Sequence, residues 1–194
     1  MSEMSVSVRH ATEDDALGIA RVHVTTRQVS YRGIVPDGSL DGLSVPARAQ
    51  RWQRILTARA ATRQCVLVAE APPGRIVGFA CAGPQGAVGG AESGDPAYAA
   101  EITGLYVLPA VQRQGIGAAL LRAVACYLAG IGARSAFLWC LAQGPAVPFY
   151  EKLGGHPVRS KQESMGGKTL DVVGYGWDDI SVLLPQPAAP ANAV

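Results

Sequence analysis

The sequence predicts a mixed α/β fold in which a mostly antiparallel sheet is flanked by helices. Three observations predict it. Short apolar segments typical of strands alternate with longer segments whose apolar residues recur at helical spacing. A turn at Pro72–Arg75 joins two strand segments into a hairpin. One strand–helix–strand unit follows, and its second strand is almost continuously apolar, as expected for a buried strand beside a crossover helix.

The beginning of the chain predicts a strand followed by two helices. Val6 and Val8 alternate with polar neighbours, and Thr12 then caps a helix whose first turn is acidic, which suits the helix dipole. Glycines and a proline predict a loop over Ser30–Ser44, and the second helix is expected to begin near Pro46.

The central segment predicts a hairpin, a long connection and a further strand. The strands of the hairpin are Val66–Ala69 and Ile76–Cys81. The connection Gly83–Pro96 is rich in glycine, and such stretches can bind phosphates. No helix follows it directly, so we interpret it as a flexible hairpin loop. Glu101–Leu108 is the next expected strand.

The remaining elements alternate between helix and strand. They are a helix from about Gly115 to Ile131, a strand at Ala136–Leu141, a short helix at Pro145–Leu153, and a closing region of one or two strands that ends with Thr169–Gly176. The segment 185–194 is rich in Pro and Ala and predicts a disordered tail. We therefore expect a single domain over residues 1–184.

Composition narrows the class of protein. Apolar residues make up 48% of the 194 residues, which predicts a folded chain with a substantial core. The net charge of +2 is small and scattered, so neither nucleic acid nor a membrane surface is an expected partner. With no signal-like or membrane-spanning run, we expect a cytoplasmic protein. The four cysteines lack metal-ligand or redox spacing, so we expect small buried hydrophobic residues and no metal.

A candidate phosphate site lies between the strand at 101–108 and the following helix. Gln112-Arg113-Gln114-Gly115-Ile116-Gly117 places two glycines at the helix start. Glycine lets the backbone approach a ligand, and the first N–H groups of a helix attract anions. Arg113 adds a cation. Taken alone, the same spacing is also typical of tight packing at a turn.

Three segments together resemble the GCN5-related N-acetyltransferase (GNAT) superfamily. They are the strand Glu101-Ile-Thr-Gly-Leu-Tyr-Val-Leu-Pro, the loop Gln112-x-x-Gly115-x-Gly117, and Phe149-Tyr-Glu-Lys-Leu-Gly154. The loop matches the family pattern Q/R-x-x-G-x-G/A at every defined position. The resemblance covers about a quarter of the chain strongly and the remainder more weakly.

This resemblance implies a sheet splayed between two strands, with acetyl-CoA bound in the V-shaped opening between 101–108 and 136–141. Pantetheine would pair with the first strand, and a backbone N–H near Val107 would polarise the thioester carbonyl. The pyrophosphate would lie on the loop at 112–118. The implied acetyl-CoA-binding residues are Leu105, Tyr106, Val107, Gln112, Arg113, Gln114, Gly115, Ile116, Gly117, Ala118, Gln143, Phe149 and Tyr150. A homodimer is also common among similar proteins.

Two residues are candidates for the proton transfers that amide formation requires. Tyr150 matches the tyrosine that points at the CoA sulfur in similar enzymes, where a phenol protonates the departing thiolate. Glu101 lies eleven residues before Gln112, the spacing of the catalytic glutamate in histone-type members. The alternatives are helix packing for Tyr150 and a surface position at a strand start for Glu101. Gln143 departs from the asparagine that many relatives carry, which leaves its contact with CoA open.

The acceptor side is less defined. Tyr31 and Trp139 are candidate acceptor-pocket residues, while core packing is the favoured interpretation of Trp52. The sequence therefore predicts an acetyl-CoA-dependent N-acetyltransferase that acylates a primary amine by direct attack in a ternary complex. A catalytically silent acyl-CoA-binding regulatory module is the alternative. A dinucleotide-binding domain is disfavoured, because Leu120 replaces the third glycine of that motif. The sequence leaves open the acceptor, the preferred acyl chain length and the oligomeric state.

Overall fold

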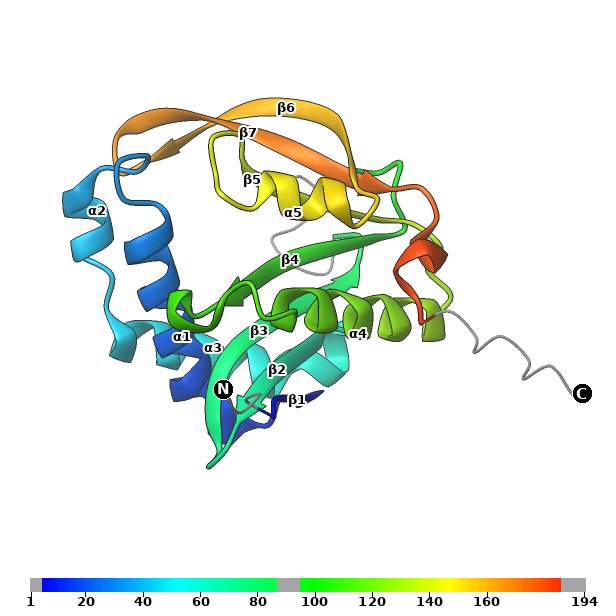
Figure 1. Ribbon diagram of the computed structural model, residues 1–194, viewed down its shortest axis with the longest axis horizontal. Coiled ribbons are helices and arrows are strands. Elements are labelled where there is room, and N and C mark those ends of the chain that lie inside the picture. Colours follow the sequence, from blue (N-terminus) through cyan, green and yellow to red (C-terminus); the bar gives the residue numbers. More distant parts are fainter. Residues whose placement is uncertain (1–4, 87–94, 186–194) are drawn as a thin grey trace, which may run out of the picture.

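The computed structural model describes residues 5–86 and 95–185, and it contains a seven-stranded sheet in the order β1-β2-β3-β4-β5-β7-β6 (Figure 1). The strands are β1 (Ser7–His10), β2 (Cys65–Ala71), β3 (Arg75–Pro84), β4 (Ala100–Val107), β5 (Ala136–Leu141), β6 (His156–Met165) and β7 (Lys168–Trp177). Neighbouring strands are antiparallel except β4 and β5, which are parallel. The predicted mixed, mostly antiparallel sheet is confirmed.

Helices cover both faces of this sheet (Figure 1). They are α1 (Ala16–Ser30), α2 (Asp37–Asp41), α3 (Val45–Thr62), α4 (Ile116–Gly130) and α5 (Val147–Lys152). One face buries Ile19 of α1 and Trp52 of α3 against β2 and β3. The other face buries Leu120 and Val124 of α4, together with Tyr150 of α5. The predicted apolar stripe of α4 is confirmed, and Trp52 packs in the core as expected.

Helix α2 lies inside the segment that the sequence predicts as loop, so that prediction is wrong at Asp37–Asp41. The helix is five residues long, and Gly42 follows it as the C-terminal cap. Arg32, which precedes the helix in the chain, forms ion pairs with Asp37 at 3.2 Å and with Asp41 at 2.7 Å. A helix this short has almost no apolar periodicity to detect.

The sequence left open whether the closing region holds one strand or two, and the exposure of strand β6 explains why. Its residues are mostly exposed or half-buried because it forms the edge of the sheet, so no alternating apolar pattern marks it. The predicted glycine-rich loop begins two residues later than expected, since β3 continues to Pro84. The rest of that loop at 87–94, and the predicted tail beyond Pro185, lie outside the described residues. Cys126 is exposed, which contradicts the expectation that all four cysteines are buried.

An ion pair ties β1 to the start of α1. The Arg9 guanidinium donates from Nη1 to Asp15 Oδ2 at 2.7 Å and from Nη2 to Oδ1 at 2.9 Å. The backbone N–H of Thr12 also donates to Asp15 Oδ2 at 2.7 Å. The hydrogen bond from Arg9, above all, holds the pKa of Asp15 below its usual value. The carboxylate therefore stabilises the fold only while it is ionised.

Replacing Asp15 with Asn is expected to lower the free energy of unfolding by about 1–3 kcal/mol at pH 7, because it removes charged hydrogen bonds from a nearly buried group. Since the folded pKa is lowered, this stabilisation is complete above the unfolded pKa of an aspartate, near 3.9, and is lost as the pH falls through the folded value. Denaturant unfolding from pH 7 to pH 3 measures it. Equal stability of the two proteins at pH 7 would contradict the prediction.

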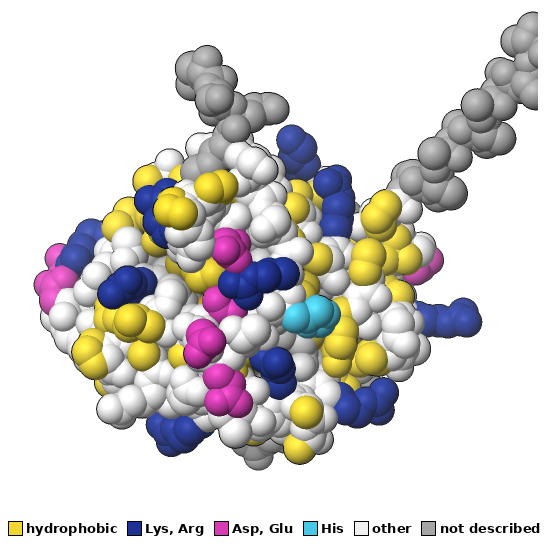
Figure 2. All heavy atoms as spheres, turned by 90° about the horizontal axis from the view of Figure 1, so that it is seen from below, with side chains coloured by type: hydrophobic (Ala, Val, Ile, Leu, Met, Phe, Trp, Pro, Cys, Tyr) yellow, Lys and Arg dark blue, Asp and Glu magenta, His cyan; other side chains and the backbone are white. Residues whose placement is uncertain are grey.

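No helix in the described part of the chain is long and apolar enough to cross a membrane. Seen from the side on which β1 lies, acidic and basic side chains are intermixed, with small apolar areas between them (Figure 2). Neither sign of charge dominates that face.

Candidate active site

The sheet is splayed between β4 and β5. These strands pair only at Ala100 with Ala136 and at Glu101 with Phe137, although β4 continues to Val107. Beyond Glu101, β4 stays paired with β3, whereas β5 pairs along its whole length with β7. The two halves of the sheet diverge from this point (Figure 1). The V-shaped arrangement expected from the sequence is therefore present.

The antiparallel ladder determines which backbone groups of β4 face this opening. The N–H of Leu108 donates to the carbonyl of Val77 in β3 at 2.8 Å. Residues alternate in direction along such a ladder, so Leu105 and Val107 direct their N–H and C=O groups away from β3. The Val107 carbonyl accepts from Gln112 Nε2 at 2.9 Å and from Thr26 Oγ1 at 3.3 Å. Tyr106 directs its own backbone toward β3.

The loop before α4 has the conformation of an anion site. Arg113 and Gly115 have positive φ values of 64° and 81°, in the left-handed region. Backbone turns of this kind gather N–H groups on one side, next to the free N–H groups at the start of α4. Residues 112–115 are exposed, and space around Gly115 is open to the addition of a side chain. A phosphate can therefore reach this backbone.

Gly117 allows close packing between helices and is not needed for an unusual backbone conformation. A Cβ added there would lie 3.3 Å from the Phe149 ring, which fixes α5 against the first turn of α4. The two interpretations of the Gly-x-Gly motif thus apply to different glycines: Gly115 shapes the anion site, and Gly117 admits the neighbouring helix.

Tyr150 of α5 lies beside the opening. It is only 6% exposed, and its ring lies 5.3 Å from that of Phe149 and 6.0 Å from that of Tyr175. Burial raises the pKa of Tyr150, and the nearby Cys140 of β5 and Tyr106 of β4 raise it further. The hydroxyl is therefore close to both diverging strands and stays protonated at neutral pH.

Glu101 lies at the vertex of the opening rather than beside Tyr150. It is 6% exposed and belongs to the last pair between β4 and β5. A strand advances about 3.3 Å per residue, so the Cα of Glu101 lies about 13 Å from that of Leu105. The sequence alternative of a surface position is wrong, because Glu101 is buried.

The two predicted acceptor residues pack against the same hydrophobic cluster. Tyr31 and Trp139 both contact the group that contains Leu141 and Leu170. Burial and the neighbouring Tyr106 raise the pKa of Tyr31. Trp139 has the Lys161 ammonium 4.3 Å from its ring centroid.

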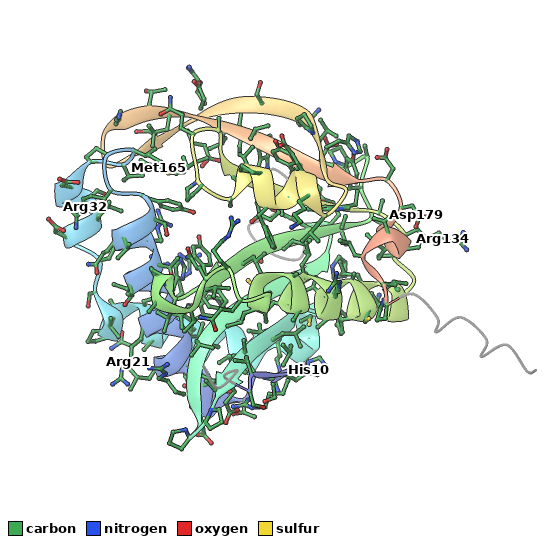
Figure 3. The ribbon with its side chains drawn as sticks, in the orientation of Figure 1. His10, Arg21, Arg32, Arg134, Met165 and Asp179 are labelled. Carbon is green, nitrogen blue, oxygen red and sulfur yellow. The ribbon has the colours of Figure 1, made fainter. Side chains whose placement is uncertain are left out.

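The segment around α2 and the tip of the β6–β7 hairpin meet next to this cluster. Lys168 Nζ donates to the Ile34 carbonyl at 3.0 Å. Arg32 and Met165, which belong to these two segments, lie on the same side of the molecule (Figure 3). Gln143 lies apart from this contact, in the exposed turn after β5.

Sequence reasoning did not single out three basic residues near Tyr31 and Tyr106: His23, Arg27 and Arg48. The His23 and Tyr106 ring centroids lie 4.6 Å apart, and Arg27 Cζ lies 5.5 Å from the centroid of Tyr31. The four-residue spacing of His23, Arg27 and Tyr31 was a usable signal, because it places them on one face of a helix.

The two cysteines nearest the opening carry neutral thiols. Burial raises the pKa of Cys140 and of Cys81 to about 11, which keeps both thiols protonated at neutral pH. In residues 5–86 and 95–185, no group of three side chains is arranged to hold a metal ion.

Comparison with known proteins identifies the family. The family described as "Acetyltransferase (GNAT) domain" matches residues 62–154. The uncharacterized N-acetyltransferase YuaI of Bacillus subtilis is 33% identical over 178 residues, which cover 92% of this chain and 96% of YuaI. The chain is thus an acyltransferase of the GNAT type, and it belongs to the GNAT superfamily of N-acetyltransferases.

Solved structures share the fold. The candidate acetyltransferase yncA of Salmonella typhimurium, solved with acetyl-CoA, has a TM-score of 0.65 at 19% identity, covering 97% of this chain and 99% of its own. The paia N-acetyltransferase of Thermoplasma acidophilum, solved with coenzyme A, has a TM-score of 0.63 at 18% identity, covering 88% of this chain and 98% of its own.

Replacing Gly115 with Val is expected to weaken acetyl-CoA binding at least about tenfold, because a β-branched residue strains the left-handed conformation that aims the N–H groups. Calorimetric titration measures the affinity. Gly132 offers a matched control at the other end of α4, with a φ of 87° and open space around it. Gly132→Val carries similar backbone strain and should leave the affinity unchanged. Equal affinities for the two variants would remove Gly115 from the donor site.

Proposed function

We propose that this protein transfers the acetyl group of acetyl-CoA directly to a primary amine within a ternary complex. The observation that carries the proposal is the divergence of β4 from β5, which leaves an unpaired backbone edge of β4 next to the anion-binding loop. A long ligand with a pyrophosphate at one end and amide groups along its arm matches both features.

The donor binds along this edge. The pantetheine amides pair with the backbone of Leu105 and Val107, whose polar groups face the opening. The backbone of Tyr106 is directed toward β3. We therefore propose that Tyr106 contacts acetyl-CoA through its aromatic ring instead. The pyrophosphate binds the backbone of the loop at 112–118, with Arg113 beside it. The Gln112 side chain already bonds the Val107 carbonyl, so it holds the loop on β4 and contributes to binding through its backbone.

The chemistry follows from the groups around the opening. A neutral amine attacks the thioester carbonyl, whose oxygen gains negative charge and is stabilised by a backbone N–H of β4, at Val107 or the equally oriented Leu105. The C–S bond breaks, and the thiolate accepts a proton from Tyr150, which solvent then reprotonates. The nitrogen loses one proton as the amide forms, and Glu101 accepts that proton through water. The raised pKa of Tyr150 keeps the phenol protonated at neutral pH, so its O–H group is available to donate to the thiolate. Direct attack is favoured over an acyl-cysteine, because the thiols of Cys81 and Cys140 stay protonated.

Calorimetric titration with acetyl-CoA, CoA and propionyl-CoA tests the donor site, and CoA release in the presence of amines tests transfer. Micromolar binding of acetyl-CoA together with amine-dependent CoA release is the expected result. Binding without release for any amine would favour the regulatory alternative. Absence of binding to all three ligands would overturn the proposal.

A further inference from the structure

A row of side chains on α1 borders the proposed place of acetyl transfer. His23, Arg27 and Tyr31 are four residues apart and share one face of the helix. His23 lies against Tyr106, with ring centroids 4.6 Å apart, and Arg27 lies over the Tyr31 ring at 5.5 Å. The nearby Tyr106 contributes, after burial, to the raised pKa of Tyr31. Leu105 and Val107, which form the unpaired edge of β4, flank Tyr106. The Tyr106 side chain therefore lies between this edge and the row of α1 side chains.

Helix α3 brings a second cation to the same place. Arg48 lies one turn before Trp52, whose Nε1 donates to His23 Nδ1 at 3.4 Å. Burial lowers the pKa of the Arg48 guanidinium, and the charges of Arg51 and Arg27 lower it further. Two half-buried guanidinium groups of like charge therefore converge next to Tyr106.

Two polar donors of this cluster lack acceptors in the part of the chain that the structure describes. Arg27 Nε and His23 Nε2 are buried and have no hydrogen-bond partner among the described residues. Since His23 Nδ1 accepts from Trp52, the proton of the neutral ring is assigned to Nε2. The pKa of His23 is lowered to about 3, mainly by burial, so the ring is neutral at physiological pH.

Among residues 5–86 and 95–185, the two arginines of this cluster also lack counter-ions. Other arginines pair with carboxylates, as Arg9 does with Asp15 and Arg159 with Asp95. Neither Arg27 nor Arg48 forms an ion pair with any carboxylate in the part of the chain that the structure describes. Unpaired buried donors and converging cations are unfavourable in a folded protein unless water or a ligand satisfies them, and a carboxylate satisfies both the donors and the charge.

We propose that the acceptor is an amine that also carries a carboxylate, such as a free amino acid, and that Arg27 and Arg48 bind this carboxylate. The inference rests on the proposed acetyl transfer and specifies its acceptor. A planar carboxylate fits the guanidinium fork, and its oxygens also accept from Nε2 of His23. Only the side chains of Tyr31 and Tyr106 separate Arg27 from the edge of β4. The acceptor must therefore be compact, so that its amine reaches the thioester while its carboxylate binds Arg27.

Matched acceptor pairs test this proposal. Initial rates of CoA release are measured for a panel of L-amino acids, for the corresponding amino-acid amides, for a polyamine and for a short peptide with a free N-terminus. For at least one amino acid, kcat/KM is expected to exceed that of its amide by roughly 10²-fold, because the amide leaves the cations unpaired. Equal rates for acids and amides, or a preference for the polyamine or the peptide, would overturn the carboxylate assignment.

Variants locate the carboxylate site. Arg27→Met should bring kcat/KM for the preferred amino acid down to the level of its amide, mainly through KM. Arg21→Met is the matched control, since Arg21 is an exposed residue on the outer side of the same helix (Figure 3). It should preserve the preference for the acid. Thermal unfolding confirms that both variants fold. Retained preference in folded Arg27→Met would refute the role of Arg27.

Titration with acetyl-CoA separates this inference from the proposed function. If acetyl-CoA binds and some amine is acetylated without regard to a carboxylate, the acceptor inference alone fails. If acetyl-CoA does not bind and no amine is acetylated, the proposed function fails, and the acceptor inference falls with it.

Discussion

Replacing Tyr150 with Phe is expected to lower kcat about 100-fold, while the affinity for acetyl-CoA stays close to that of the unmodified protein. The phenol lies beside both diverging strands, and no described residue forms a hydrogen bond with its hydroxyl. The hydroxyl is therefore free to donate to the sulfur of the departing CoA. The ring, which packs against Phe149 and Tyr175, is retained in the variant. Steady-state kinetics and calorimetric titration measure the two quantities.

Tyr175→Phe is the matched control. It removes a hydroxyl from a ring whose centroid lies 6.0 Å from that of Tyr150, but this hydroxyl donates to Glu151 Oε1 at 2.8 Å. Its loss should affect stability by about 1 kcal/mol and leave kcat nearly unchanged. If Tyr150→Phe and Tyr175→Phe have the same kcat, Tyr150 contributes packing rather than proton transfer.

The residues that we propose for the donor half of the site are close in sequence, so local motifs were able to point to them. Gly115 and Gly117 lie in one loop, and Tyr150 lies in a short motif. Local patterns of this kind depend on backbone conformation and helix starts, which neighbouring residues determine. The buried strand β5 was predicted with its observed limits because it is apolar throughout.

The residues that we propose for the acceptor half were harder to predict, because packing between helices brings them together. Arg27 and Arg48 are distant in sequence and meet only because α1 packs on α3. Tyr31 and Trp139 were chosen separately, and the structure shows that they contact one hydrophobic cluster. The ladder that turns the backbone of Tyr106 toward β3 also depends on register, which the sequence alone does not specify.

Replacing Glu101 with Gln is expected to lower kcat/KM about 10- to 100-fold at neutral pH, because we propose that this carboxylate accepts the proton of the attacking amine. Glu101 lies about 13 Å along β4 from Leu105, so one or more water molecules must carry the proton from the amine to the carboxylate. Glu101 is buried at the vertex of the opening, at the last pair between β4 and β5. The loss of kcat/KM in Glu101→Gln should become smaller as the pH approaches the pKa of the amine. At that pH the neutral amine forms without help from Glu101.

A pH profile of kcat/KM distinguishes this role from a structural one. Glu70→Gln on β2 is the matched control, because Glu70 pairs with Arg9 near the opposite edge of the sheet. It should leave the pH profile unchanged, although it weakens an ion pair. A proton relay predicts a loss for Glu101→Gln that depends on pH, whereas a purely structural effect reduces the rate equally at every pH. A uniform loss would assign deprotonation of the amine to solvent and leave Tyr150 as the sole side chain that transfers a proton in the reaction.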